Sequence, residues 1–347
     1  MKIAYIIPSL SQVGPVILLQ NLIKGLLCDN HNADISVFYF DNICEVQLPC
    51  TTKQINFNTP INFDEYDIIH THCFRADRYV IKWRKKINRA KIVTTIHQDT
   101  YESFRYDYPP IIAYLLTRYW LYLQKKFDLI TAISHQIENR YSKYLCGKSM
   151  TIHNGVNVEK GIINSNIISQ INNFKLKYRL MGSYAKIVER KGLDQLIDIL
   201  HELKDVGLVI MGDGPYKKTL QQLIEKRGLQ QQILFLPSTA YPYLYLENID
   251  IYCMPSYSEG FGLAMVEAAL VGKAIVCSDL PSFHEIFSPD EACFFELRNK
   301  QSLLNAINKA FQEKEFLGEK CLKRAKTDFT YSVMAKNYYS AYERLLK

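Results

Sequence analysis

The sequence predicts an α/β protein built from two doubly wound parallel-sheet domains. Short apolar runs alternate with longer segments of helical periodicity along the 347 residues. Within each run the apolar residues are continuous, as expected for strands buried on both faces of a parallel sheet. The alternation occurs twice, on either side of a polar, Asn-rich stretch at 162–174. We therefore expect two domains with a boundary near that stretch.

The predicted N-terminal domain covers residues 1–165. Its first apolar run is too short for the core of a signal peptide and ends at Pro8, so it predicts a strand. The runs are separated by segments long enough for the crossover connections that parallel strands require. The expected strands are Ile3–Ile7, Ile35–Phe40, Ile68–Ile69, Ile92–Ile96 and Leu129–Ala132.

The predicted second domain covers residues 175–328, and residues 329–347 follow it as a final helix. In that helix the residues at three- and four-residue steps share one face. Since a single amphipathic helix is not stable alone, it must dock on a domain. The expected strands are Leu208–Met211, Ile233–Leu236, Ile251–Met254 and Ala274–Cys277, and the helix face is Tyr331, Met334, Tyr338, Tyr342 and Leu346.

Composition excludes several classes of protein. Hydrophobic residues make up 48% of the chain and charged residues 22%, which is typical of a folded globular protein and not of a disordered one. The absence of an 18-residue apolar run argues against a transmembrane helix. The nine cysteines are scattered and include no Cys-x-x-Cys pair. This pattern favours reduced thiols in the cytoplasm over a zinc site or a disulfide framework.

Positive charge is concentrated in one segment. The net charge is +7, and between His70 and Lys91 eight Lys or Arg residues accompany a single acid, Asp77. The segment 75–126 continues with an aromatic, apolar stretch, and this combination is typical of helices that lie on anionic membranes. We therefore expect peripheral binding to the inner face of the plasma membrane. A solvated helix beside a core helix is the alternative, and nucleic acid is not an expected partner because no nucleic-acid module surrounds the basic run.

The stretch 255–268 is the most informative part of the sequence. It follows a predicted strand and opens a helix, and Gly260 and Gly262 allow the backbone to approach a ligand closely. The unpaired amides at the start of that helix favour an anion. Glu267 lies about one turn into the helix, where its carboxylate can accept two hydroxyl hydrogen bonds, as a ribose diol requires. Glu259 lies in the preceding loop.

This stretch resembles the hallmark of the retaining glycosyltransferases of family 4, in which two glutamates separated by seven residues enclose Phe-Gly-Leu. The resemblance covers essentially the whole chain. It implies a GT-B fold, in which two Rossmann-like domains face each other across a cleft and the final helix returns to the N-terminal domain. It also implies that Glu267 binds the ribose and Glu259 the donor-sugar hydroxyls. Phe261, Gly262 and Leu263 are expected at the nucleotide, the last two with their amides on the diphosphate.

A basic turn before the helix at 193–200 supplies cations. Lys186 and Lys191 flank the turn, and two cations beside a diphosphate would neutralise the charge developing on a leaving nucleoside diphosphate. The family has Gly-Arg where this chain has Ala185 and Lys186. Because lysine lacks the planar fork of arginine, Arg190 is a candidate to supply it. The alternative is a solvated basic turn.

Residues of the N-terminal domain complete the prediction. His97 follows a buried strand at the edge where open α/β sheets bind ligands. The resemblance implies that His97 faces the donor sugar. Its backbone carbonyl would stabilise the cationic sugar, or its side chain would orient a hydroxyl. His70 and His72 lack a third ligand at a usual spacing, so we expect packing or cleft-edge histidines and not a metal site. Gly14, before a helix that Pro15 can open, would let a phosphate approach backbone amides.

The sequence thus predicts a retaining glycosyltransferase that moves a sugar from a nucleoside-diphosphate donor to the hydroxyl of a glycan or lipid-linked glycan. By family analogy the setting is bacterial surface polysaccharide synthesis, such as O-antigen, capsule or lipopolysaccharide. No Asp-x-Asp pair occurs to hold a divalent cation, so neither a metal nor another cofactor is expected. Two alternatives stay open. One is a nucleotide-sugar epimerase on the same fold, and the other is a degenerate sugar-binding protein, which Val13, Val16 and Lys186 would suit.

Overall fold

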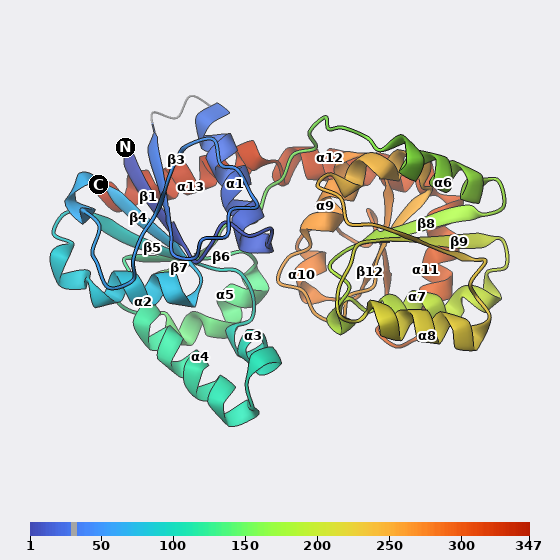
Figure 1. Ribbon diagram of the computed structural model, residues 1–347, viewed down its shortest axis with the longest axis horizontal. Helices are drawn as coiled ribbons and strands as arrows, with labels where there is room; N and C mark the ends of the chain where they lie inside the picture. The colour runs from blue at the N-terminus through green and yellow to red at the C-terminus, as the bar shows by residue number, and fades with distance from the viewer. Residues whose placement is uncertain (29–32) are drawn as a thin grey trace. The chain divides into compact units, whose positions relative to one another are not determined.

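Two parallel β-sheets form the centres of two units (Figure 1). The structure, a computed structural model, describes residues 1–28 and 33–347. The first unit consists of Met1–Val156 together with Phe329–Lys347, and the second of Asn157–Asp328. Each unit has its own sheet and its own helices, so the predicted class of two doubly wound α/β domains is confirmed.

The first unit has a seven-stranded parallel sheet in the order β3-β2-β1-β4-β5-β6-β7. All five residues of β4 and the last five of β1 are buried, which explains their continuous apolar runs. The edge strand β3, in contrast, is polar and exposed along its whole length. The strands are β1 (Lys2–Ile7), β2 (Asp34–Tyr39), β3 (Thr51–Gln54), β4 (Ile68–His72), β5 (Lys91–Ile96), β6 (Leu129–Ala132) and β7 (Ser149–Thr151).

Helices cover both faces of this sheet (Figure 1). The C-terminal helix α13 packs closely against α1. A Cβ atom at Gly25 of α1 would lie only 2.6 Å from the carbonyl oxygen of Tyr331. The helices are α1 (Gly14–Cys28), α2 (Phe74–Lys82), α3 (Thr100–Asp107), α4 (Pro110–Gln124), α5 (His135–Tyr141) and α13 (Tyr331–Leu346), with short 3-10 turns η1 (Phe63–Glu65), η2 (Arg84–Lys86) and η3 (Ser142–Tyr144).

The second unit has a six-stranded parallel sheet in the order β10-β9-β8-β11-β12-β13. Its strands β9, β11 and β12 are buried throughout and lie in one apolar core with the helices around them. The strands are β8 (Arg179–Tyr184), β9 (Val206–Met211), β10 (Ile233–Leu236), β11 (Ile251–Met254), β12 (Ala274–Ser278) and β13 (Cys293–Phe295).

The helices of the second unit complete a doubly wound arrangement. Leu303, Ile307 and Phe311 of α11 bury their side chains in the core, at the spacing expected for one face of a helix. The helices are α6 (Ser165–Lys175), α7 (Leu193–Ile199), α8 (Lys217–Arg227), α9 (Leu263–Leu270), α10 (Pro281–His284), α11 (Lys300–Gln312) and α12 (Lys314–Asp328), with 3-10 turns η4 (Glu189–Lys191), η5 (Leu200–Glu202) and η6 (Pro242–Asn248).

The border between the units lies before the polar stretch in which we expected it. The structure places the border after Val156 and forms helix α6 within that stretch. Asn164 caps the helix by accepting a hydrogen bond from the Asn166 backbone, and Ile167 and Ile171 are buried. The two isoleucines, four residues apart, supply an apolar stripe that the surrounding asparagines obscure in the sequence.

Both sheets reverse their strand order between their first and fourth strands. In the first unit this occurs between β1 and β4, and in the second between β8 and β11. Ligands of open α/β sheets bind beyond the carboxyl ends of the strands at such a reversal. The loops that follow β8 and β11 therefore stand at the expected ligand site of the second unit.

The cysteines and the helices can be compared with the expectations of reduced thiols and of no transmembrane helix. All nine cysteines are free, and four of them, Cys253, Cys277, Cys293 and Cys321, are buried. Among the described residues, every helix is too short or too polar to span a bilayer.

Candidate active site

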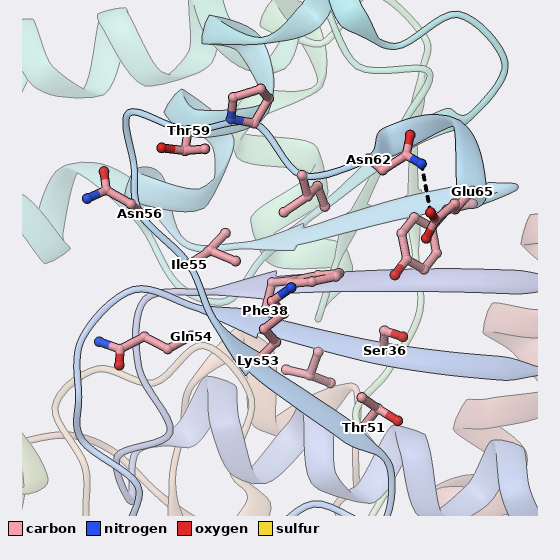
Figure 2. A pocket seen from close by; sticks show the side chains of 14 residues that line it. Ser36, Phe38, Thr51, Lys53, Gln54, Ile55, Asn56, Thr59, Asn62 and Glu65 are labelled. Atoms are coloured by element: carbon pink, nitrogen blue, oxygen red, sulfur yellow. Dashed lines mark hydrogen bonds between the residues drawn. The ribbon is translucent and has the colours of Figure 1, made fainter.

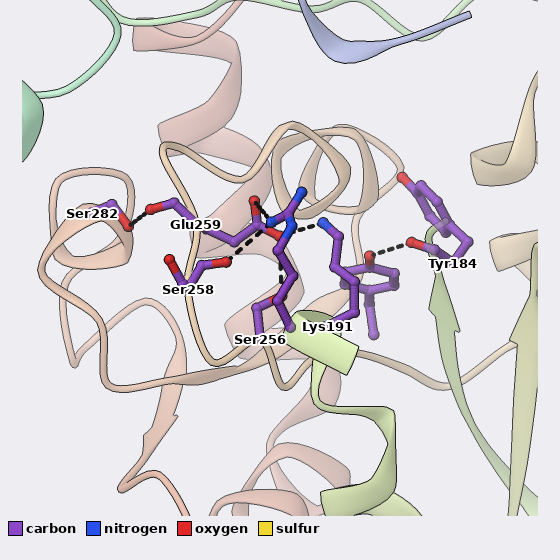
Figure 3. Close-up of polar contacts among 8 residues, drawn as sticks. Tyr184, Lys191, Ser256, Ser258, Glu259 and Ser282 are labelled. Atoms are coloured by element: carbon purple, nitrogen blue, oxygen red, sulfur yellow. Dashed lines mark hydrogen bonds and ion pairs between the residues drawn. The ribbon is translucent and has the colours of Figure 1, made fainter. Parts of the chain in front are cut away.

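A buried carboxylate between two cations lies beyond the carboxyl ends of β8 and β11. Glu259, in the loop between β11 and α9, forms an ion pair with Lys191 and a second with Arg190 at 3.3 Å. Figure 3 shows the Lys191 side chain directed at the Glu259 carboxylate. The side chains of Glu259, Lys191 and Arg190 are 10%, 16% and 33% exposed, so this cluster is only partly hydrated. Charges held in such surroundings interact more strongly than charges in water.

Hydrogen bonds fix Glu259 further. The hydroxyl of Ser256 donates to its carboxylate at 3.1 Å, and the hydroxyl of Ser282 donates to its backbone carbonyl at 3.0 Å. Burial alone would raise the pKa of Glu259, but the charges of Lys191 and Arg190 outweigh burial and lower it. Glu259 is therefore ionised at neutral pH and held in one place.

Glu267 is the second carboxylate of the site, and its surroundings have the opposite effect. It lies on α9 and is partly buried, with the hydroxyl of Tyr184 donating to it at 2.8 Å. Burial raises the pKa of Glu267 to about 7, although the Tyr184 hydrogen bond opposes this rise. Both protonation states therefore occur near neutral pH. Only the ionised state can accept hydrogen bonds from two hydroxyls at once.

The start of α9 explains the Phe-Gly-Leu sequence. Gly262 has φ +133° and ψ +49°, a conformation that L side chains rarely adopt, and a Cβ atom there would lie 3.0 Å from the Phe283 ring. Phe261 is 2% exposed, so its ring belongs to the core. Leu263 begins the helix, whose first N–H groups have no partner within it and favour an anion. The phosphate contacts of Gly262 and Leu263 stay predictions that this geometry permits.

The two predicted lysines lie in different surroundings. Lys191 is directed into the cluster, whereas Lys186 is exposed and forms no ion pair with any other described residue. Arg190 donates to the Ser258 carbonyl at 3.2 Å as well as contacting Glu259. The structure thus brings Lys191, Arg190 and Glu259 together and leaves Lys186 at the surface.

His97 belongs to the first unit and follows β5. It is partly buried, and its Nε2 atom lies 2.9 Å from Nδ1 of His72. Burial lowers the pKa of His97 to about 3, so it is neutral at physiological pH. His70 is buried between Tyr342 and Thr95, which hydrogen bond its two ring nitrogens at 2.6 and 2.7 Å. His70 and His72 are both fully buried in the first unit.

Gly14 is the exposed first residue of α1. A Cβ atom at this position would meet no other described atom within 4 Å, and the residue does not have a positive φ. The described structure therefore gives no steric reason for glycine there. The predicted approach of a phosphate to Gly14 stays a prediction.

Sequence reasoning missed three residues that position the predicted ones. Tyr184 holds Glu267, Ser256 holds Glu259, and His72 holds His97. Tyr184 and Ser256 follow from strand order, because β8 and β11 are neighbours and their ends meet at one edge. The sequence alone does not reveal which strands are neighbours, so this signal became readable only with the sheet.

A separate cavity of about 520 Å³ lies in the first unit (Figure 2). It adjoins the exposed edge strand β3 and the segment 55–66, and Phe38 and Ile55 form part of its apolar lining. Asn62 donates to Glu65 at its rim. None of the predicted site residues lines this cavity, so we do not assign it to the site at Glu259.

The two doubly wound sheets and the charged cluster at the strand reversal define a class of protein, the α/β proteins that bind nucleotides at the carboxyl ends of their strands. Comparison with known families narrows this class. Residues 164–328 match the family model of the glycosyl transferases group 1, and residues 57–160 match that of glycosyltransferase family 4.

Known proteins resemble the chain over its full length. The O-antigen biosynthesis glycosyltransferase WclY of Escherichia coli is 27% identical over 360 aligned positions, which cover 100% of this chain and 99% of WclY. Sucrose-phosphate synthase from Thermosynechococcus elongatus has a TM-score of 0.83 at 16% identity, covering 99% of each chain. Anabaena HepE in complex with UDP and glucose has a TM-score of 0.83 at 19% identity, covering 99% of this chain and 100% of HepE. The chain belongs to the family 4 glycosyltransferases and has the GT-B fold.

Proposed function

We propose that this protein is a retaining glycosyltransferase that transfers a sugar from a nucleoside-diphosphate donor to an acceptor hydroxyl during synthesis of a bacterial surface polysaccharide. The full-length similarity to WclY supports a role in polysaccharide synthesis, because that relative is named for O-antigen biosynthesis. HepE is described in complexes with UDP and glucose and with UDP-glucose, which makes UDP-sugars the first donors to test.

The observation that carries this proposal is the pair of cations on Glu259. Lys191 and Arg190 place two positive charges at the strand reversal, against Glu259 in the loop that leads into α9. Charge that develops on a departing diphosphate would be stabilised there by groups already in position. The ionised Glu259 would accept hydrogen bonds from sugar hydroxyls, and the ionised Glu267 from the ribose diol.

We further propose that the reaction needs no metal ion. The charge that a divalent cation would supply on the diphosphate is available from Lys191 and Arg190. Retention is proposed to follow a front-face route, in which the departing phosphate takes the acceptor proton. The bond from the anomeric carbon to the phosphate oxygen breaks as the bond to the acceptor oxygen forms on the same face.

A donor panel tests the site. UDP-, GDP- and ADP-sugars are added in EDTA to the full chain and to Glu267→Ala, and thermal stability is measured. A ligand at 100 times its Kd adds about 2.7 kcal/mol, so a true donor shifts the wild-type melting temperature visibly and the variant much less. No shift with any donor, with or without Mg²⁺, would overturn the proposed site.

Turnover then tests the cations. With the donor that binds, Lys191→Ala is expected to lower kcat by about 10²–10³, the effect of losing one group that stabilises developing charge. Lys177→Ala is a matched control, because Lys177 is exposed and lies just before β8, at the opposite edge of the sheet. NMR of the product reads the anomeric configuration. Inversion, or loss of activity in EDTA, would contradict the corresponding part of the proposal.

We also propose that an anionic membrane is a partner, through helix α4. Its buried side packs on the first unit through Ala113, Thr117, Trp120, Leu121 and Gln124. The other side exposes a stripe of large apolar residues, which are Ile111 (76%), Leu115 (60%), Tyr119 (45%) and Tyr122 (57%). Arg118, Lys125 and Lys126 lie on or next to this helix, and their charge suits anionic lipid and not a neutral apolar partner.

The basic segment before α4 should contribute less to membrane binding than its sequence indicates. Arg75 is paired with Asp41 and Arg89 with Asp67, so two of its cations are already engaged. Flotation with phosphatidylglycerol vesicles at low salt should therefore depend on α4. Ile111→Ser with Leu115→Ser should lose binding, while Ile162→Ser, a matched change at a residue 96% exposed in the second unit, should keep it. Equal flotation of both variants, or self-association through α4 in place of flotation, would refute this partner.

A further inference from the structure

A second histidine, His72, contacts His97 in the first unit. His72 ends strand β4 and is fully buried, and its Nδ1 atom lies 2.9 Å from Nε2 of His97. In the sheet, β4 and β5 are neighbours, and His72 is in register with Thr95, two residues before His97. The pair is therefore set by the sheet itself and not by a loose contact between loops.

The other ring nitrogen of His72 decides how the pair shares its hydrogens. Nε2 of His72 is buried and has no hydrogen-bond partner among the described residues. If His97 donated to His72, the hydrogen of His72 would sit on Nε2 as a buried N–H without an acceptor. Buried N–H groups without a partner are rarer than buried acceptors without one. His72 therefore carries its hydrogen on Nδ1 and donates it to Nε2 of His97.

Packing keeps His72 in this orientation. Its ring stacks on His70 at 4.5 Å between ring centroids, and the ring of Tyr5 lies at 5.9 Å. His70 is itself fixed at both nitrogens, by Tyr342 and Thr95. Burial lowers the pKa of His72, with the neighbouring rings of His70 and His97 adding to the effect, so the pair is neutral.

We propose that His72 is a positioning residue that holds His97 as its Nδ1–H tautomer. His97 then offers an N–H donor from Nδ1, while its Nε2 lone pair is occupied and cannot take a proton from an acceptor hydroxyl. The role of this donor rests on the proposed function. It would bind an oxygen of a substrate, so His97 acts as a hydrogen-bond donor and not as a general base.

The tautomer can be measured without turnover. The full chain is labelled with ¹⁵N-histidine, and long-range ¹H–¹⁵N spectra distinguish Nδ1–H from Nε2–H rings, with His97→Asn assigning the signals. We expect the Nδ1–H pattern for both His72 and His97. An Nε2–H pattern for His97 in the wild-type protein would overturn the proposal.

Two replacements of His72 separate the hydrogen bond from the packing. His72→Asn keeps an N–H donor near the position of Nδ1, so His97 should stay in the Nδ1–H form, whereas His72→Leu should release it to the other tautomer. His201→Asn is the control, because His201 is exposed in the second unit. An unchanged His97 pattern in a folded His72→Leu protein would also overturn the proposal. If His72→Leu fails to fold, loss of the Nδ1–H pattern of His97 in His72→Asn would overturn it instead.

Kinetics give the functional readout. We expect His72→Leu to lower kcat about tenfold, the order of one lost hydrogen bond, with the donor KM little changed, and His72→Asn to restore most of kcat. A fall in kcat of equal size in both variants would show a packing role and refute positioning. Absence of transfer in the wild-type protein, with the Nδ1–H pattern present, would instead refute the proposed function and leave the tautomer assignment intact.

Discussion

Two carboxylates eight residues apart acquire opposite properties from their neighbours. Glu259 lies beside Lys191 and Arg190, which lower its pKa. Glu267 is partly buried and has no cation beside it, so burial raises its pKa to about 7. The sequence shows the same residue type at both positions. The difference arises because the loop turns Glu259 toward the basic turn while α9 places Glu267 against β8.

Replacing Glu267 by glutamine should stabilise the protein without ligand at high pH. The folded-state pKa of Glu267 lies above its unfolded value of 4.5, so its contribution is full below pH 4.5 and is lost as the pH rises through about 7. Glutamine cannot ionise and can still accept from Tyr184. Glu267→Gln should therefore exceed the wild type by about 1–3 kcal/mol at pH 8 and by much less at pH 5.

Calorimetry at the two pH values measures this difference, since 1 kcal/mol shifts the melting temperature by roughly 2–4 °C in a unit of this size. Glu225→Gln is the matched control, because Glu225 is exposed on α8 and its replacement should change stability by less than about 0.5 kcal/mol. A wild-type protein as stable as Glu267→Gln at pH 8 would mean that Glu267 is well hydrated.

At the scale of elements, α13 is joined to the first sheet by tyrosine hydroxyls. Tyr342 bonds His70 at 2.6 Å and Tyr5 at 3.2 Å, and Tyr338 lies 3.2 Å from Thr95. Removing one hydroxyl by Tyr342→Phe leaves a buried ring nitrogen of His70 without its partner. The expected loss is about 1–3 kcal/mol of unfolding free energy, seen as a lower melting temperature.

The same chemical change at the surface is its control. Tyr122→Phe, on the exposed side of α4, should alter stability by less than about 0.5 kcal/mol. If both tyrosine variants melted with the wild type, the Tyr342 hydroxyl would contribute nothing measurable to the attachment of α13.

The strands that sequence predicted, and those it missed, differ in burial and length. Runs such as Leu129–Ala132 and Ile251–Met254 matched the observed strands because burial on both faces makes them continuously apolar. The edge strand β3 is exposed and polar, and β7 and β13 have three residues each, too few for a pattern. The central strand β8 was missed because Gly182 and Ser183 interrupt its apolar run.

The missed strand β8 explains why the sequence did not show Tyr184 at the site. The spacing of Glu259 and Glu267 was readable from one local motif, and the basic turn with Lys191 was readable from another. Tyr184 ends β8, and its contact with Glu267 spans 83 residues of sequence. Contacts of this kind depend on which strands are neighbours, a property of the whole sheet that no local pattern encodes.

At the scale of the whole molecule, the first unit is discontinuous in sequence and the second is not. The first unit is completed only by Phe329–Lys347, which supply five side chains to its core at 0–1% exposure. These are Phe329, Met334, Ala335, Tyr338 and Tyr342. The second unit, Asn157–Asp328, contains all of Glu259, Glu267 and Lys191. Folding of the first unit should therefore depend on the end of the chain, and nucleotide binding should not.

Ending the chain after Asp328 separates these two properties. The full-length protein should melt in two calorimetric transitions. The nucleotide of the donor that binds, at 100 times its Kd, should raise the transition of the second unit by several degrees, about 2.7 kcal/mol. In the shortened chain the transition of the first unit should be lost or fall steeply, because its core loses those buried side chains. The nucleotide-dependent shift should persist. Removing only residues 346–347, where Leu346 is 42% exposed, should change neither transition. A shortened chain that keeps the transition of the first unit would show that α13 is dispensable, and one that loses the nucleotide-dependent shift would show that the nucleotide site needs the first unit.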